Sequence, residues 1–209
     1  MTNTLLIVFV KNKTLGTVKT RLAKTIGDYG AFEVYTELLK ITEKVANQVP
    51  YSKRIYFSNN VEENTWGNHI KTIQNGANLG DRMLNAFKDG FNAGYENIVL
   101  IGSDLPDISE TEINEAFEAL KTKDAVFGPA EDGGYYLIGL SKLIPEVFSN
   151  KPWSQPSLLN ETLKTLTQNN STFSTLKTLN DIDTYDDLIA SKFYKNNKIL
   201  QEKIQQLND

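Results

Sequence analysis

The sequence predicts an α/β protein: a single-domain, three-layer α/β/α fold in which a mainly parallel sheet lies between two layers of helices. Two nearly continuous apolar runs, Leu5–Val10 and Asn97–Gly102, are typical of parallel strands that are buried on both faces. Stretches with apolar residues every three or four positions alternate with strand patterns along the whole chain. Such alternation favours strand–helix–strand units and therefore a parallel sheet.

Each element is predicted from its own pattern. After the first strand, apolar residues recur at helical spacing from Val34 to Val49, and Pro50 ends this helix. Further helices are expected at 79–93, from 109 or 110 to 120, near 143–148, at about 156–167, and from 185 almost to the end with a break near 196–197. Further strands are expected at 53–58, 69–74, 124–128, 135–140 and 172–179.

Composition excludes several classes of chemistry. The 209 residues include no cysteine and one histidine, His69, which excludes disulfides, thiol catalysis, cysteine zinc sites and sites built from several histidines. A net charge of −4, from 22 basic and 26 acidic residues, argues against a dedicated nucleic-acid binder. What remains is chemistry by carboxylates, lysines, arginines, backbone amides and a hard metal ion.

Length and patterning predict one domain over residues 1–195, with 196–209 as a helical tail of the same domain. The tail can either pack on the body, which we expect, or meet a partner as in a homodimer. No apolar stretch is long enough to span a membrane, and the first residues lack the features of a signal peptide. We therefore expect a cytoplasmic protein without membrane insertion.

A basic loop follows the first strand. From Lys11 to Arg21 it holds four cations, Lys19 among them, together with Gly16 and three threonines. A loop that leaves a parallel strand and enters a helix presents free backbone amides, and its cations can neutralise a diphosphate or a triphosphate. The loop is not a Walker loop. The alternative interpretation is a solvated basic loop.

Arginine is rare, with three among the 22 basic residues, and two of the three stand in glycine-containing turns. These are Arg21 and Arg82, the second within Leu-Gly-Asp-Arg-Met. A planar, bidentate donor in such a turn suits a phosphate or a carboxylate. A structural salt bridge explains the pattern equally well.

An aspartate follows the second buried strand in Gly-Ser-Asp-Leu-Pro-Asp, residues 102–107. A carboxylate at this place points into the ligand crevice of an open α/β sheet. Asp104 is therefore the predicted ligand of Mg²⁺ or Mn²⁺, which would bridge phosphate oxygens. Asp107 is predicted to cap the next helix or to support the site, although Ser109 is better placed as the cap.

Residues 128–140 contain two acids followed by two glycines, Gly133 and Gly134, and then two tyrosines. Adjacent glycines allow the backbone to approach a ligand closely. Asp132 is thus a candidate general base or acceptor-binding group. The alternative is an ordinary acidic hairpin turn, since Asp-Gly is a common turn signal.

Residues 179–188 hold four aspartates around Thr184. The arrangement of Asp183 or Thr184 followed by Asp186 and Asp187 is close to a helix-capping box. A carboxylate at Asp181 or Asp183 can also reach a metal held by Asp104, and we carry Asp183 forward as a second candidate ligand.

Taken together, these motifs resemble the nucleotide-diphospho-sugar transferase superfamily, whose Rossmann-like fold is called GT-A. More closely, the chain is similar to a bacterial family of glycosyltransferases assigned to arsenosugar biosynthesis, also described as radical-SAM/selenodomain-associated transferases. The architecture also resembles 2-phospholactate guanylyltransferases and molybdenum-cofactor nucleotidyltransferases. The segments that carry the resemblance are Val18–Leu22, Leu79–Met83, Gly102–Pro106, Gly128–Leu140 and Leu179–Leu188.

The resemblance implies a role for each matching position. Lys11, Lys19 and Arg21 would contact the donor phosphates, and Asp104 would hold the metal. Gln74 and Gly80 would lie where related nucleotidyltransferases read the base. Asp132, Gly133 and Gly134 would face the acceptor.

The chain departs from the superfamily at two places. Its first loop lacks Gly-x-Gly-Thr-Arg, which argues against pyrophosphorylase-type chemistry. Asp104 stands alone rather than in an Asp-x-Asp pair, so a metal there needs a distant partner.

We therefore expect a metal-dependent transferase that moves a glycosyl group from a nucleotide sugar to a small-molecule acceptor. Lys19 and Arg21 would assist departure of the diphosphate, and Asp132 would orient or deprotonate the acceptor. One alternative is nucleotidyl transfer from a nucleoside triphosphate to a phosphorylated small acid. Another is a nucleotide-binding domain without turnover.

Overall fold

The computed structural model describes residues 3–207; positions 1–2 and 208–209, the ends of the predicted domain and tail, lie outside the described residues. Its sheet has seven strands in the order β3-β2-β1-β4-β6-β5-β7. All strands run in one direction except β6, which is antiparallel to β4 and β5. The strands are β1 (Thr4–Val10), β2 (Ser52–Phe57), β3 (Ile70–Ile73), β4 (Asn97–Ile101), β5 (Ala125–Pro129), β6 (Tyr135–Leu140) and β7 (Phe173–Thr175).

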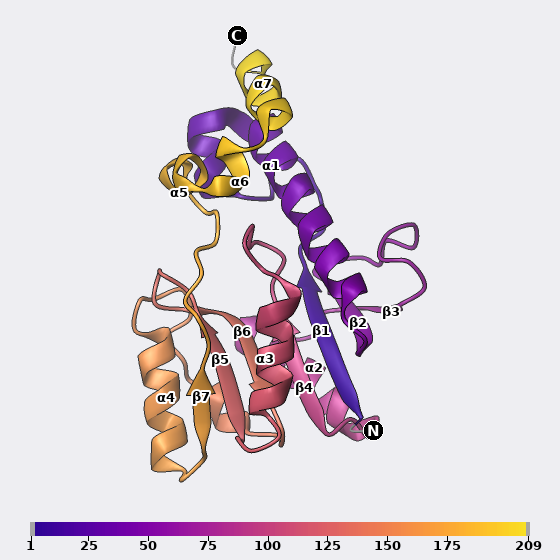
Figure 1. Ribbon diagram of the computed structural model, residues 1–209, viewed down its shortest axis with the longest axis vertical. Helices are drawn as coiled ribbons and strands as arrows, with labels where there is room; N and C mark the ends of the chain where they lie inside the picture. The colour runs from indigo at the N-terminus through magenta and orange to yellow at the C-terminus, as the bar shows by residue number, and fades with distance from the viewer. Residues whose placement is uncertain (1–2, 208–209) are drawn as a thin grey trace.

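Helices cover both faces of this sheet, which confirms the predicted three-layer α/β/α fold (Figure 1). The C-terminal half of α1 and the helix α3 pack on one face, and α2, α4 and the short 3₁₀ turn η1 pack on the other. The helices are α1 (Thr20–Gln48), α2 (Leu79–Asn92), α3 (Glu110–Ala119), η1 (Pro145–Val147), α4 (Leu158–Gln168), α5 (Tyr185–Ala190), α6 (Lys192–Lys195) and α7 (Lys198–Gln206).

The central strand β1 explains why its sequence is apolar without interruption. Side chains alternate between the faces of a strand. Accordingly, Leu6 and Val8 enter the core under α1 and α3, whereas Leu5 and Ile7 enter the core under α2. Because both faces are covered, every position from Leu5 to Val10 is buried and apolar.

The first helix extends well beyond the sheet. It begins at Thr20, and Gly27 interrupts it with a left-handed backbone at φ 73° and ψ 165°. A residue with a side chain rarely adopts this conformation, so glycine allows the kink. The turns that follow the kink pack Val34 and Leu38 into a third apolar cluster, outside the two sheet faces.

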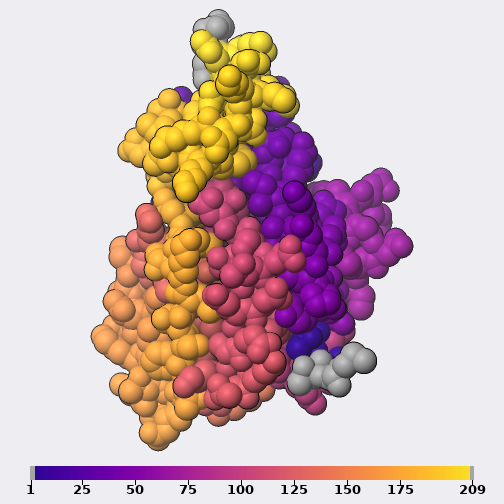
Figure 2. All heavy atoms as spheres, in the orientation of Figure 1, coloured from indigo at the N-terminus to yellow at the C-terminus, as the bar shows by residue number. Residues whose placement is uncertain are grey.

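The C-terminal helices complete that third cluster. Leu188 of α5 and Leu200 of α7 are buried against α1, and Figure 2 shows these helices (yellow) lying over the start of α1 (indigo) at one end of the molecule. The predicted break near 196–197 separates α6 from α7, and Ser191 adds a second break by capping α6. The tail therefore packs on the body.

One predicted strand is longer than the observed strand. Residues 172–179 were expected to be extended throughout, but β7 ends at Thr175. The chain then leaves the ladder and returns only at Leu179, which forms an isolated bridge with Ala130. Within residues 3–207, no helix combines the length and the apolar character needed to cross a bilayer.

Docking of α7 can be tested at Leu200, whose side chain is 1% exposed. We expect Leu200→Ala to lower the free energy of unfolding by about 2–5 kcal/mol, because it leaves a cavity between α7 and α1. Leu207→Ala is the matched control, since Leu207 is 48% exposed, and it should change the value by less than about 1 kcal/mol. Urea denaturation followed by circular dichroism measures both, and equal effects would contradict the docking.

Candidate functional site

A cleft of about 210 Å³ lies at the carboxyl edge of β1 and β4, where an open α/β sheet binds its ligands. It brings together the loop after β1, the segment after β4 and the segment before α5. The residues that line it are Lys11, Val18, Lys19, Thr20, Arg21, Tyr35, Asp104 and Asp183. Five of the residues predicted for phosphate or metal binding therefore meet in one place: Lys11, Lys19, Arg21, Asp104 and Asp183.

The ammonium of Lys19 lies at the centre of this cleft. Its Nζ is 3.1 Å from Asp104 Oδ2 and 3.1 Å from Asp183 Oδ1, and its side chain is 3% exposed. Burial alone would lower the pKa of Lys19, but the two carboxylates more than offset that effect and raise it. The amine is therefore a protonated, buried cation between two anions.

Arg21 extends the network to the surface. Its guanidinium pairs with Oδ2 of Asp183, and its side chain is 65% exposed. Asp183 thus contacts two of the three predicted phosphate-binding cations, Lys19 and Arg21, while the carboxylate of Asp104 stays 43% exposed. Asp104 keeps an accessible carboxylate for a ligand. The salt bridge considered for Arg21 is present.

The amino end of α1 also faces this loop. Lys19 is its N-cap residue, in the left-handed region at φ 48° and ψ 47°, and no side chain caps the helix. The first turn contains no acidic residue. An uncapped helix start presents free backbone N–H groups and a positive dipole end, both of which favour an anion.

Tyr35 forms the floor of the cleft and was not identified from the sequence. Its hydroxyl accepts a hydrogen bond from the Lys11 N–H at 3.0 Å and donates to the Lys11 carbonyl at 2.9 Å. It also lies 3.0 Å from Ser103 Oγ. Burial and the nearby Asp104 raise the pKa of Tyr35, so the hydroxyl stays protonated. This side chain joins the ends of β1 and β4.

Asp181 lies between the cleft and the acidic hairpin. Burial is the main cause that raises the pKa of Asp181 to about 6, and the neighbouring Asp183, Asp132 and Asp104 add to it while Lys19 opposes it. The segment around it is held in place, because Leu179 accepts a hydrogen bond from the Glu131 N–H at 3.2 Å. Three carboxylates from this end of the sheet therefore act on Asp181.

The hairpin between β5 and β6 has the tight turn that its glycines predict. Gly133 has φ 87°, and a Cβ there would lie 2.1 Å from the carbonyl oxygen of Pro156. Both the conformation and the space require glycine. Asp132 Oδ1 accepts a hydrogen bond from the Gly134 N–H at 2.8 Å, which leaves the exposed Asp132 oriented by its own turn.

The two residues predicted to read the base, Gln74 and Gly80, lie outside the cleft. Gln74 donates from Nε2 to the carbonyls of Val10 and Tyr56, so its amide hydrogens already bind the sheet edge. Gly80 is buried in α2, and a Cβ there would lie 2.5 Å from the Phe148 carbonyl oxygen and 2.7 Å from the Trp153 ring. In the structure, Gly80 therefore allows close packing of α2 against Phe148 and Trp153.

Arg82 and Gly16 likewise do not line the cleft. Arg82 donates from Nε to the Gly76 carbonyl at 3.3 Å. Gly16 stands in the exposed turn of the first loop, three residues before Lys19. Both positions stay predictions for ligand contacts. Among residues 3–207, Arg82 forms no ion pair.

Helix caps account for part of the acidic motifs. Ser109 caps α3 with Glu112, and Thr184 caps α5 with Asp187, each in a complete capping box, as the patterns predict. Asn12 is a further organising residue that was not singled out. Its Oδ1 accepts hydrogen bonds from the Asn59 and Asn60 N–H groups. An asparagine two residues after a buried strand was the available signal.

A divalent cation fits the donor chemistry of the cleft. Asp104 and Asp183 converge closely enough to contact one ammonium, and carboxylate oxygens are what Mg²⁺ and Mn²⁺ prefer. Within the described residues, no group of three or more histidine or acidic side chains is arranged to hold a metal. Two protein ligands are thus offered, and the ammonium of Lys19 stands between them.

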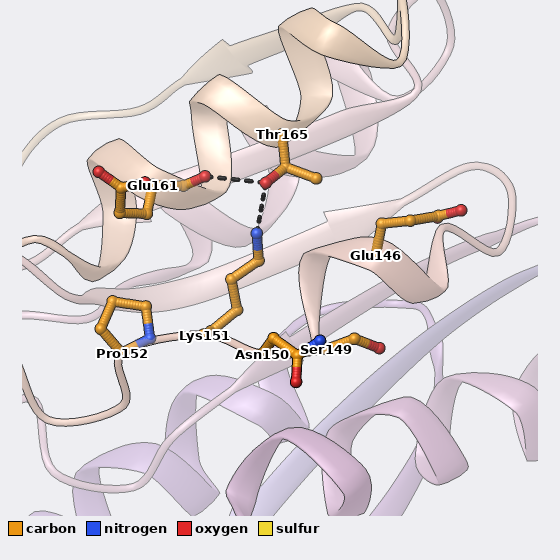
Figure 3. Close-up of a pocket in the computed structure, with 7 residues that line it drawn as sticks. All are labelled: Glu146, Ser149, Asn150, Lys151, Pro152, Glu161 and Thr165. Carbon is orange, nitrogen blue, oxygen red and sulfur yellow. Dashed lines mark hydrogen bonds between the residues drawn. The ribbon is translucent and has the colours of Figure 1, made fainter.

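A larger hollow of about 400 Å³ lies elsewhere, between α4 and the segment that follows η1 (Figure 3). Lys151 points across it and donates to Thr165 Oγ1 on α4. Glu146 and Glu161 flank this lysine. The hollow contains none of the predicted site residues. Because Lys151 binds the segment after η1 to α4, we assign this lysine a structural role.

The chain belongs to a family described as "Uncharacterized protein conserved in bacteria (DUF2064)", whose model matches residues 42–155. The matched part contains Asp104 and the Asp132 hairpin, whereas Lys19, Arg21 and Asp183 lie outside it. Among curated proteins, none matches the sequence.

Solved structures place the chain in the nucleotide-diphospho-sugar transferase fold. A protein from Desulfovibrio desulfuricans G20, provisionally described as a nucleotide-diphospho-sugar transferase, is 28% identical over 99% of this chain and 97% of its own, with a TM-score of 0.88. A 4-diphosphocytidyl-2C-methyl-D-erythritol synthase from Anaerococcus prevotii DSM 20548 is 13% identical, covers 94% and 99% of the two chains, and has a TM-score of 0.61. A CMP:2-keto-3-deoxy-manno-octonic acid synthetase solved with CTP is 10% identical, covers 98% and 100%, and has a TM-score of 0.57.

Tyr35→Phe tests the junction between β1 and β4. We expect the free energy of unfolding to fall by about 1–3 kcal/mol, because the Lys11 backbone and Ser103 lose their buried partner. Tyr29→Phe is the matched control, since Tyr29 is 62% exposed, and it should have little effect. Thermal and urea unfolding provide the comparison; a null effect of Tyr35→Phe would show that the junction does not depend on the hydroxyl.

Asp181→Asn tests the buried carboxylate through pH. The pKa is about 6 in the folded state, against about 4 unfolded, so ionisation of Asp181 destabilises the fold as the pH rises from about 4 to 6. The variant should therefore be more stable at pH 7, on the order of 1–2 kcal/mol, and no longer lose that increment over this range. Asp186→Asn, on the exposed side of α5, should keep the wild-type pH dependence.

Proposed function

We propose that this DUF2064 member is a transferase that binds a nucleotide-activated donor and passes its glycosyl group to a small-molecule acceptor. The observation that carries the proposal is the cleft itself. At the carboxyl edge of the sheet, Lys11, Lys19 and Arg21 surround the accessible carboxylate of Asp104 beside the uncapped start of α1. Cations, free amides and a metal-binding carboxylate together suit a nucleoside diphosphate.

The donor diphosphate would lie against the start of α1. Backbone N–H groups of the first turn and the Lys11 ammonium bind its oxygens, and Arg21, which is largely exposed, can release Asp183 and turn to it. As the bond between the sugar C1 and the phosphate oxygen breaks, negative charge grows on the diphosphate. Lys19 and Arg21 stabilise that charge.

A divalent cation held by Asp104 and Asp183 would act as a Lewis acid on the same phosphate oxygens. Mg²⁺ or Mn²⁺ is proposed here on the donor set alone. The chain's own contribution is to hold two carboxylates at one point and to keep cations on either side of them.

The acceptor would approach from the hairpin between β5 and β6. Asp132 is exposed there and electrostatically linked to Asp181, which in turn neighbours Asp104 and Lys19. Asp132 accepts the proton of the attacking acceptor hydroxyl while the acceptor oxygen bonds to C1. The tight turn at Gly133, which packs against the Pro156 backbone, fixes the orientation of Asp132 through the Gly134 N–H.

Nucleotidyl transfer would use the same cations. They can hold a triphosphate while a phosphorylated acid attacks the α-phosphorus and pyrophosphate leaves. We favour glycosyl transfer because the carboxylates of Asp132 and Asp181 on the acceptor side repel a phosphorylated acceptor. The resemblance to the arsenosugar-biosynthesis family and the cytoplasmic location stay predictions.

A single screen separates these functions. Nucleoside diphosphates, triphosphates and nucleotide sugars are added with and without Mn²⁺, and the thermal midpoint is recorded; a ligand at 100 times its Kd adds about 2.7 kcal/mol. Hits are then assayed for products. Glycosylated acceptor without pyrophosphate supports the proposal, pyrophosphate release supports nucleotidyl transfer, and binding without turnover across a broad acceptor panel supports a binding domain.

Asp104→Asn tests the metal assignment. The variant keeps the size of the side chain but removes its charge, so Mn²⁺-dependent donor affinity should fall by about tenfold or more while the fold survives. Asp107→Asn, three residues away and exposed, should behave as wild type. Calorimetric titration of the best nucleotide measures both. Equal Mn²⁺-dependent affinity in wild type and Asp104→Asn would refute the assignment.

A further inference from the structure

Two roles proposed for the cleft compete in space. Lys19 is proposed for the phosphates, and Asp104 and Asp183 are proposed for a divalent cation. In the structure these three groups instead satisfy one another, with both carboxylates 3.1 Å from the same ammonium. A cation cannot bind between the carboxylates unless Lys19 leaves.

Leaving is unfavourable for Lys19 without a new partner. The side chain is 3% exposed, and an ammonium that loses its counter-ions inside a protein suffers a large desolvation penalty. A divalent cation alone would create that situation. It would neutralise the carboxylates and leave Lys19 buried and unpaired.

A diphosphate alone faces the opposite problem. If Lys19 turns to the phosphate, Asp104 and Asp183 lose the ammonium they share and lie near a second group of negative charges. If Lys19 stays, two carboxylates already occupy two of its three N–H donors. Either way a metal-free phosphate gains little from this lysine.

The two ligands together solve both problems. The cation replaces the ammonium on the carboxylates, and the diphosphate receives the ammonium. Lys19 is also the left-handed N-cap of α1, at φ 48°, a conformation that a non-glycine residue keeps only when its surroundings hold it.

We infer that Lys19 acts as an internal competitor for the divalent-cation site, so that the cleft takes the cation and the diphosphate as a pair and excludes either alone. The inference rests on the proposed function, because it assumes a nucleotide diphosphate in this cleft. Each ligand then raises the affinity for the other by the same factor, as thermodynamic linkage requires.

Binding of Mn²⁺ without nucleotide, measured on the full chain by the electron paramagnetic resonance signal of free Mn²⁺, tests the inference. Lys19→Met keeps the length of the side chain and removes the competing charge. We expect its Kd for Mn²⁺ to be about tenfold lower than that of wild type. Lys13→Met, in the same basic loop but exposed, should leave the Kd unchanged. Circular dichroism verifies the fold, and Lys19→Gln replaces Lys19→Met if that variant does not fold.

A second measurement uses the wild type alone. Inorganic pyrophosphate serves as a base-independent diphosphate, and the thermal midpoint should rise with pyrophosphate and Mn²⁺ together by clearly more than the sum of the separate shifts. In Lys19→Met this excess should shrink. An equal or higher Kd for Mn²⁺ in Lys19→Met, tight binding of Mn²⁺ alone to wild type, or additive shifts in wild type would each overturn the inference.

These outcomes are distinguishable from failure of the proposed function. If no nucleotide donor supports transfer but Lys19→Met gains Mn²⁺ affinity, the transferase proposal fails and the competition by Lys19 stands. If donors are turned over but Lys19→Met binds Mn²⁺ no better, the transferase proposal stands and Lys19 is an ordinary phosphate ligand.

Discussion

A buried ammonium must have anionic partners, and in this protein that requirement joins three distant parts of the chain. Lys19 begins the first long helix, Asp104 follows the fourth strand, and Asp183 comes just before α5. Each of these segments is also held at the carboxyl edge by backbone contacts of its own. The Tyr35 hydroxyl binds Lys11 in the loop before Lys19, and the pairing of β4 with β1 positions the segment that contains Asp104. The bridge between Leu179 and Ala130 positions the segment that contains Asp183. The ion pairs therefore form where these three segments already meet, and their residues line the cleft at the carboxyl edge of the sheet.

The fold could be predicted because its signals are local. Both central strands are apolar after their first residues, Thr4 and Asn97, since helices cover both faces, and the helix caps at Ser109 and Thr184 are short, complete motifs. The predictions differ from the structure in segments whose conformation is determined by tertiary contacts. The segment 172–179 leaves the sheet after Thr175, although its residues are compatible with a longer strand.

The candidate site could be predicted only in part. Lys11, Lys19, Arg21 and Asp104 were found because loops after parallel strands are expected to hold ligands, and all four line the cleft. Tyr35 was missed because a tyrosine on the apolar side of a helix gives no indication that its hydroxyl will meet a strand end. Gly80 has a motif that suggests a ligand, yet its missing side chain accommodates Trp153. The role of a glycine can be assigned only when the residues that pack against it are known.

The direction of β1 has a practical consequence for handling the protein. This strand starts at Thr4 at one edge of the sheet and delivers the basic loop to the other, whereas the last helices lie at the same end of the molecule as the start of α1 (Figure 1). A purification tag or a surface linkage before β1 therefore lies a full strand length from the cleft. The same addition after α7 would be attached to the helices that support α1, the helix whose first turn lines the cleft.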